Sequence, residues 1–194
     1  MKQNKLLTIG LAVLGFICIN VIASLVYTRI DLTEDKRYTL SEQAIKAADA
    51  FNSTIVIDVL LEGDLPAEFA KLKIETQQLL EEFASRNDNI KFNFVDPLSD
   101  NSRTEATIAE LQSLGLTPAN VTVEENGRVS QEIIFPWAMV NYNNKTIRVS
   151  LLKNKLGASS EERVNKSVQN LEYAFADAFT KLAIKTKKRV AVIK

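Results

Sequence analysis

The sequence predicts an α/β protein in which an N-terminal helix crosses a membrane and a folded α/β body follows it. Three observations lead to this prediction. The chain of 194 residues begins with a long uncharged run, strand-like and helix-like segments then alternate, and Phe135-Pro136-Trp137 stands directly before a predicted strand. The last residues, 187–194, resemble one more strand, with which a further α/β domain would begin.

The uncharged run extends over the 22 residues from Leu6 to Tyr27. A helix of that length measures roughly 33 Å, which is enough to cross the hydrocarbon core of a bilayer. A cleaved signal peptide is the main alternative, because Lys2 and Lys5 precede the run and Val21-Ile22-Ala23 resembles a cleavage site. The run continues past that site, so we interpret it as an uncleaved anchor. Its Cys18 follows Phe16-Ile17, which disfavours a lipid-modified cysteine.

Charge gives only a weak indication of orientation, because three positive groups flank each side of the run. A short N-terminal tail is most easily left in the cytoplasm, so we expect the body on the outer, periplasmic side of the inner membrane. The predicted division is residues 1–28 for tail and anchor, 29–51 for a juxtamembrane connector with a short helix, and 52–186 for the extracytoplasmic domain.

The first half of the body alternates between helix and strand signals. Ser41 caps a short helix that reaches about Phe51, and residues 54–61 form a β-branched strand. Pro66 starts a helix with apolar residues at helical spacing, and residues 90–95 alternate as a strand. A further helix is expected over residues 104–114, ending at a glycine.

Two hairpins and a long helix follow in the second half. The hairpins turn at Asn126-Gly127 and at Asn143-Asn144, which are residues that tolerate positive φ. Ser159 opens a capping box, and an apolar stripe from Val164 to Leu182 predicts one continuous helix packed on a sheet. This order of elements is that of a thioredoxin-like α/β sandwich, in which a proline, often cis, precedes the third core strand; Pro136 stands at that place.

The composition excludes several kinds of chemistry. The chain has no histidine and a single cysteine, which lies in the apolar run, so histidine-based catalysis and a redox cysteine pair are excluded. No phosphate-binding loop occurs, and 24 basic residues balance 24 acidic ones, so neither nucleotide hydrolysis nor nucleic-acid binding is indicated. We therefore predict no catalytic residue, no metal site and no cofactor.

Two features of the body deserve a functional and a structural interpretation side by side. The carboxylate pairs Glu62/Asp64, Glu81/Glu82 and Glu124/Glu125 are most simply solvated surface, although the first follows a strand and could bind a cation. Phe135-Pro136-Trp137 either packs in the core below a turn or forms an exposed aromatic recognition surface.

The sequence resembles a known family in several segments. These are RIDLTEDKRYTLS after the apolar run, EGDLPAEF, LLEEF, FVDP and NKSVQNLEYAFADAFTKL. Together they are similar to the GldG family, which comprises gliding-motility-associated auxiliary proteins of ABC transporters in Bacteroidota. The resemblance implies an accessory membrane subunit beside a permease and an ATPase, with a second α/β domain starting near Val190. It supplies no catalytic residues.

Two classes of function remain open. In the first, the protein is a non-catalytic transporter subunit that contacts permease or envelope partners; the candidate contact residues are Arg29, Asp31, Arg37, Tyr38, Phe135, Pro136 and Trp137. The charged stretch that begins at Arg29 could equally be a simple connector at the lipid surface. In the second, the body is a solute-binding or sensing domain. Its pocket would lie at the carboxyl ends of the strands, near Glu62 to Pro66 and Asp96 to Pro97.

Overall fold

The computed structural model describes residues 11–15, 17, 20, 39–100, 102–125, 128–153 and 157–184. The chain divides into two compact units, Met1–Arg37 and Tyr38–Lys194. In the first unit, residues 11–15, 17 and 20 are helical, and the apolar side chains at Leu11, Val13 and Leu14 are exposed. Most of the predicted span lies outside the described residues. Within the described ranges, no helix combines the length and apolar character that a membrane crossing requires.

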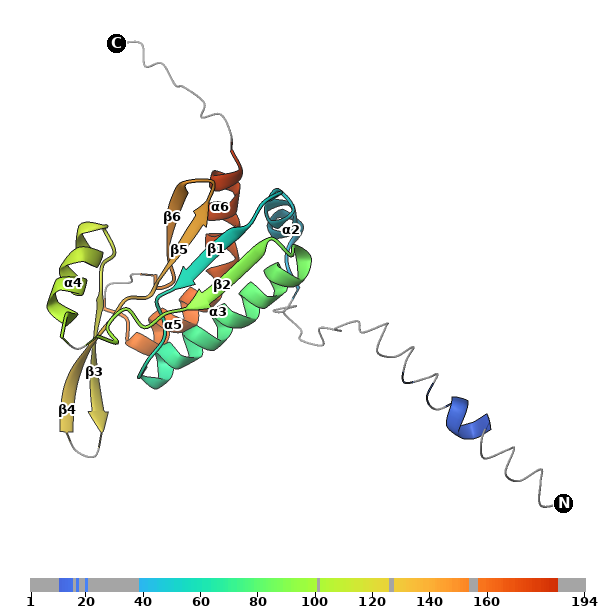
Figure 1. The fold of residues 1–194 in the computed structure, drawn as a ribbon. Helices are drawn as coiled ribbons and strands as arrows, with labels where there is room; N and C mark the ends of the chain where they lie inside the picture. Colours follow the sequence, from blue (N-terminus) through green and yellow to red (C-terminus); the bar gives the residue numbers. More distant parts are fainter. Residues whose placement is uncertain are drawn as a thin grey trace, which may run out of the picture. The chain divides into compact units, whose positions relative to one another are not determined.

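The second unit is built on a mixed sheet of four strands, which confirms the predicted α/β class (Figure 1). Its strands are β1 (Ile55–Val59), β2 (Ile90–Phe94), β5 (Trp137–Tyr142) and β6 (Lys145–Ser150), in the order β2-β1-β5-β6. Strands β1 and β2 run parallel, whereas β1 with β5 and β5 with β6 run antiparallel. The parallel pair requires a crossover, and helix α3 (Ala67–Arg86) supplies it.

One face of the sheet carries the main core. Alternate residues of β1 are buried, as the period of two in a strand requires. They pack with α3, α2 (Glu42–Ala48) and α6 (Leu171–Ala183) in one apolar cluster. Phe179 is fully buried at its centre, with three other phenylalanine rings at centroid distances between 5.0 and 6.2 Å. These three rings are Phe51, Phe83 and Phe175.

The helix caps and the turn predicted from the sequence lie at the boundaries of these elements. The Ser41 hydroxyl accepts a hydrogen bond from the amide of Ala44 and caps α2, and Pro66 precedes α3. The β5–β6 hairpin turns through Asn143 (φ 45°) and Asn144 (φ 61°), as a two-residue turn with positive φ at both positions requires.

The predicted long C-terminal helix is wrong, because two helices occupy its range. Helix α5 (Ser160–Val168) ends in a tight turn in which the amide of Asn170 bonds the carbonyl of Ser167, and α6 begins at Leu171. The Ser167 hydroxyl also accepts from the amide of Lys153, so α5 is bound to the segment after β6. The apolar stripe continues across this break and its members are buried or half-buried, which is why periodicity alone did not reveal the break.

The opposite, outer face of the sheet is covered only in part. Helix α4 (Thr104–Ser113) has no fully buried residue. It contributes half-buried side chains to a small second cluster around Leu60, Leu116 and Phe135, at the end of the sheet where β5 begins. Strands β3 (Ala119–Glu125) and β4 (Arg128–Ile134) pair with each other as the predicted hairpin and form a separate two-stranded sheet beside α4 (Figure 1).

Candidate binding site

A pocket lies at the edge of the sheet where β1 and β2 end. Because these strands are parallel, the loops that follow them leave the sheet at the same edge. The strand β4 forms the opposite wall, and the cavity has a volume of about 220 Å³. The cavity lies at the two loops where the sequence predicts the pocket of a solute-binding domain. We call it the acidic pocket; its lining residues are Leu60, Glu62, Asp64, Leu65, Asp96, Pro97, Leu98, Glu132, Ile133, Ile134 and Phe135.

The lining combines a buried apolar part with carboxylates. Leu60, Ile134 and Phe135 are all buried, with Phe135 only 1% exposed. Four acidic side chains accompany them, two from the loop after β1, one from the loop after β2 and one from β4. Such a lining favours a ligand that has a positive group and an apolar stem. The stem can be buried against the apolar residues while the positive group contacts the carboxylates.

One of these carboxylates is held by a lysine from helix α3. The Lys73 ammonium group donates to Glu62 Oε1 at 2.5 Å and also lies 5.8 Å from the centre of the Phe94 ring. The hydrogen bond from Lys73, together with its charge, lowers the pKa of Glu62, against a smaller opposing effect of burial. Glu62 is therefore ionised at neutral pH, and its direction is fixed by α3.

A second carboxylate, that of Asp96, lies where the two loops approach each other. Asp96 Oδ1 accepts from the amide of Leu98 at 2.9 Å, which fixes the turn after β2. Its other oxygen lies against Gly63: a Cβ at that glycine would stand 2.7 Å from Asp96 Oδ2. Gly63 also has φ of +95°, which side chains rarely adopt. Both the backbone conformation and the closeness of Asp96 therefore favour glycine after Glu62, and the two loops lie close together at this point.

Comparison with known proteins gives one family. Residues 34–141 match a family described as a domain of unknown function, DUF7088. The chain belongs to this family. The matched range includes every residue that lines the acidic pocket, from Leu60 to Phe135. No curated protein and no solved structure matches the chain.

The structure places the predicted contact residues in two groups. Arg29, Asp31, Arg37 and Tyr38 lie outside the described residues. Phe135 and Pro136 are buried, which corresponds to the core-packing interpretation and leaves neither on the accessible surface as a free recognition element. Phe135 instead lines the acidic pocket. The predicted strand does begin at Trp137, and the described backbone, including the bond before Pro136, contains no cis peptide.

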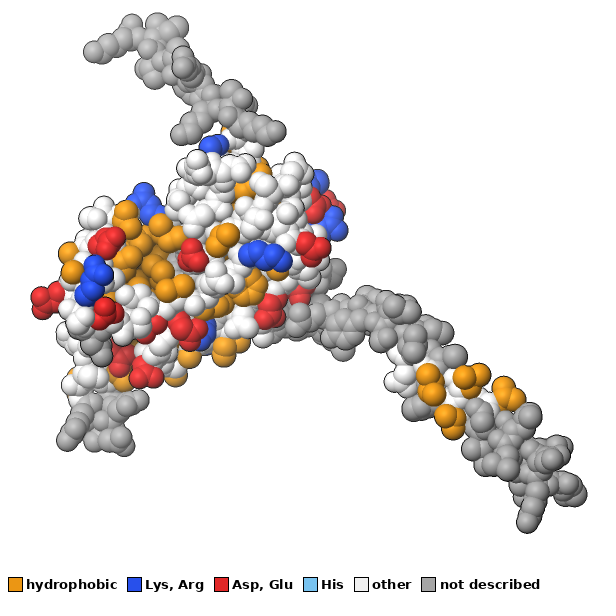
Figure 2. Space-filling model, in the orientation of Figure 1, with side chains coloured by type: hydrophobic (Ala, Val, Ile, Leu, Met, Phe, Trp, Pro, Cys, Tyr) orange, Lys and Arg blue, Asp and Glu red, His pale blue; other side chains and the backbone are white. Residues whose placement is uncertain are grey.

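Trp137 takes part in the contact between α4 and the sheet. It is half-buried, and its indole nitrogen donates to the carbonyl of Thr117 at 2.8 Å. Hydrophobic side chains gather beside α4 in Figure 2, where Leu111, Trp137 and Met139 belong to the second apolar cluster. Leu114, which directly follows α4, is 45% exposed. Trp137 therefore anchors α4 loosely rather than forming a free aromatic surface.

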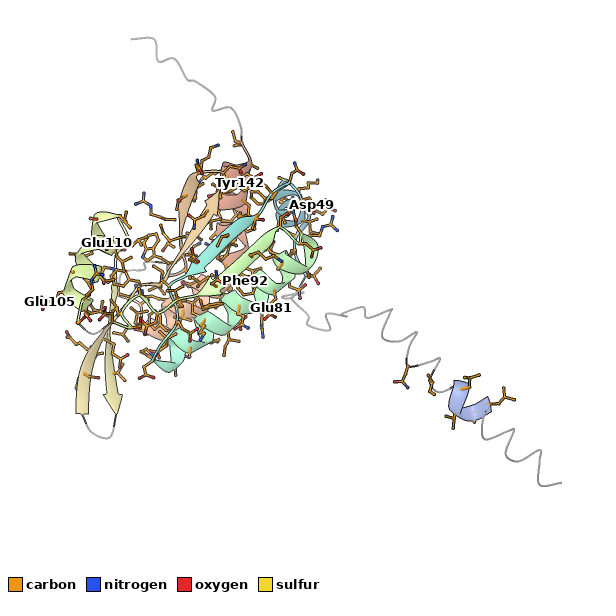
Figure 3. All side chains as sticks on the ribbon, in the orientation of Figure 1. Asp49, Glu81, Phe92, Glu105, Glu110 and Tyr142 are labelled. Atoms are coloured by element: carbon orange, nitrogen blue, oxygen red, sulfur yellow. The ribbon has the colours of Figure 1, made fainter. Side chains whose placement is uncertain are left out.

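Of the other two carboxylate pairs, Glu81/Glu82 is not among the residues that line the pocket. Glu81 is exposed on α3 and accepts a hydrogen bond from Gln77 (Figure 3). The side chains of Glu124 and Glu125 lie outside the described part. Among the described residues, no three His, Cys, Asp or Glu side chains converge closely enough to hold a metal ion.

A second surface was not expected from the sequence. On the outer face of the sheet, one polar side chain from each strand forms a row. Asp58 Oδ2 accepts from Asn141 at 3.3 Å and Oδ1 accepts weakly from Asn93 at 3.5 Å, while Asn141 Oδ1 accepts from Thr146 at 2.7 Å. Polar residues at alternate strand positions are the signal that the sequence offers. The face of the sheet on which they lie can be assigned only when the register is known.

Proposed function

We propose that this protein is a non-catalytic, membrane-anchored auxiliary subunit of an ABC transporter associated with gliding motility. Its α/β body would lie in the periplasm and bind a permease, an envelope partner or both. The observation that carries the proposal is a pocket whose lining contains neither a thiol nor a histidine, placed where a thioredoxin-like domain would have its redox cysteines.

The strand arrangement supports the thioredoxin-like part of the proposal. A parallel pair joined by a helix, followed by an antiparallel hairpin on the other side of the first strand, is the arrangement expected of such a sandwich. In this protein the β3–β4 hairpin is inserted before the second half, and α4 stands at one end of the outer face.

The chemistry of the pocket supports binding rather than catalysis. The loop after β1 reads EGDLPAEF and contains no thiol, and the whole chain contains no histidine. Two of its four carboxylates are held in place, Glu62 by Lys73 and Asp96 by the amide of Leu98, as groups of a preorganised binding surface are. The resemblance to the GldG family supports the choice of a permease and an ATPase as partners.

The N-terminal run supports the membrane anchor. Leu6–Tyr27 carries no charge, and its described helical part exposes apolar side chains such as Leu11 and Leu14. An anchored domain meets a membrane partner at a high effective concentration, so a modest interface on the body is sufficient.

The proposal is tested by a pull-down from native membranes. We compare the intact protein with a variant in which the stretch Arg29 to Ser41 is scrambled, and we identify the recovered proteins by mass spectrometry. We expect the permease and the ATPase with the intact protein and less of both with the variant. Their absence from both samples would refute the transporter role. Equal recovery would show that the stretch is only a connector.

A solute-binding or sensing domain is the second candidate function. The observation that favours it is the position of the acidic pocket at the carboxyl ends of two parallel strands, where α/β proteins commonly bind small ligands. A thermal shift of the intact protein with a library of organic amines distinguishes this candidate, because a transporter subunit that binds only proteins would show no shift.

A further inference from the structure

The acidic pocket borders strand β4, because three consecutive residues of that strand, Glu132 to Ile134, line it. Successive side chains of a strand point to opposite faces, so three lining residues in a row bring the backbone of β4 close to the cavity. The register of the hairpin pairs β4 with β3. The other edge of β4 pairs with no strand among the described residues.

That edge has unused backbone groups in the described part of the chain. Residues of β4 make no backbone hydrogen bond outside the hairpin ladder among the described residues. Two apolar side chains of the strand are accessible: Val129 is 69% exposed and Ile133 is 41% exposed. A free strand edge of this kind pairs readily with an extended segment of another chain.

The charge of the neighbouring wall selects the kind of segment. Glu62, Asp64 and Asp96 face β4 from the two loops, and Glu132 faces them from β4 itself. Among the described residues, Lys73 forms an ion pair with one of these carboxylates, that of Glu62. An incoming basic side chain would meet the remaining negative groups over an apolar base.

The size of the cavity agrees with a side chain rather than a whole small molecule. Pockets for drug-sized ligands usually measure about 300–1,000 Å³. The 220 Å³ of the acidic pocket is below that range, and residues of β4 form part of its lining. A segment that pairs with β4 would place every second side chain on the pocket side.

We propose that the acidic pocket and the free edge of β4 together bind an extended basic segment of a partner protein. The segment adds a strand to the β3–β4 hairpin and inserts a lysine or arginine side chain between the loops and Glu132. This inference rests on the proposed role as a protein-binding subunit, and it specifies the partner's chemistry.

The probe is a fluorescein-labelled peptide of four Lys-Val repeats, and its binding to the intact chain in detergent is measured by fluorescence anisotropy. Three comparison peptides are used: four Glu-Val repeats, the Lys-Val peptide with alternate backbone amides methylated, and free spermidine as a competitor. We expect binding of the Lys-Val peptide only, with loss on methylation because strand pairing needs the amides. Competition by spermidine together with insensitivity to methylation would overturn the proposal in favour of a small-cation site.

The matched variants separate the pocket from general surface charge. Asp64→Asn with Glu132→Gln removes two charges from the pocket without removing the contacts of Glu62 or Asp96. Glu105→Gln with Glu110→Gln removes two charges from exposed positions that project from α4 (Figure 3). We expect about tenfold weaker peptide binding for the first pair, as two partly exposed charge contacts would give, and less than twofold for the second.

Equal weakening by both pairs would overturn the proposal, since it would show only long-range attraction. Circular dichroism of each variant establishes that the fold is retained. The pull-down described above, repeated with Asp64→Asn/Glu132→Gln, keeps this inference distinct from the transporter role. If peptide binding is absent but permease and ATPase are recovered, the inference fails and the proposed function stands.

Discussion

Replacing Gly63 with alanine should destabilise the body through two separable effects. The backbone at Gly63 has φ of +95°, and holding a residue with a side chain in a left-handed conformation costs roughly 1–2 kcal/mol. The new Cβ would also stand 2.7 Å from Asp96 Oδ2 and displace that side chain. Loss of the hydrogen bond that the Leu98 amide donates to Asp96 would cost about 1 kcal/mol more. We therefore expect the free energy of unfolding to fall by roughly 2–3 kcal/mol in total.

Gly157→Ala is the matched control. Gly157 also has positive φ, at +76°, but among the described residues no heavy atom beyond its chain neighbours lies within 4 Å of the place its Cβ would take. This variant should therefore lose only the backbone term of roughly 1–2 kcal/mol. The difference between the two variants measures the contact with Asp96.

Urea unfolding of the intact chain, followed by tryptophan fluorescence, gives the free energies. Trp137 is the only tryptophan, so the signal reports on the body. The urea concentration at the midpoint of unfolding should fall, while the slope of the unfolding free energy against urea concentration should stay unchanged. Equal losses for Gly63→Ala and Gly157→Ala would refute the role of Asp96, and so would a Gly63→Ala loss that persists undiminished when Asp96→Ala is added.

Three further predictions concern the core, the pocket and the anchor. Phe179→Ala should cost about 3–5 kcal/mol in urea unfolding, because Phe179 is fully buried, whereas the 71% exposed Tyr173 should tolerate alanine within about 0.5 kcal/mol; similar losses at both sites would contradict the assigned core. The pKa of Glu62 is lowered by Lys73, so its contribution to stability is complete above the unfolded-state pKa of about 4.3 and is lost as pH falls through the lower folded value. The melting temperature of Glu62→Gln should therefore fall less on acidification than that of the natural protein. Identical pH profiles of the melting temperature would contradict the ion pair. The mature protein should retain Met1 to Tyr27 and resist carbonate extraction, whereas a soluble form starting at Ser24 would reveal a signal peptide.

The elements of the body could be predicted because local chemistry determines them. Ser41 and Ser159 accept hydrogen bonds at the starts of α2 and α5, and the asparagine pair at 143–144 supplies the two positive φ angles of a hairpin. The break between α5 and α6 could not be predicted in this way. Near the break, Ser167 accepts a hydrogen bond from the amide of Lys153 in the segment after β6, and such a tertiary contact leaves no trace in the apolar period.

The acidic pocket could be predicted only in part, for a related reason. Its two loops follow parallel strands, so their meeting at one edge is a consequence of topology and was expected. The third wall was not expected, because Glu132 comes from a hairpin that belongs to another sheet. The direction of the Phe135 side chain could not be predicted from the sequence either. In the structure Phe135 is buried and lines the pocket.

The pocket is rigid on one side and open on the other, and this asymmetry favours a binding role. Lys73 fixes Glu62 from α3, and Asp96, which accepts from the Leu98 amide in its own loop, lies close to Gly63 of the other loop. A partner that enters therefore has little ordering of these loops to induce, which reduces the entropic cost of association. The β4 side offers an accessible strand edge whose backbone groups become fully paired when a segment is added. Preorganised charge on one wall and an open hydrogen-bonding edge on the other are what an extended basic segment requires.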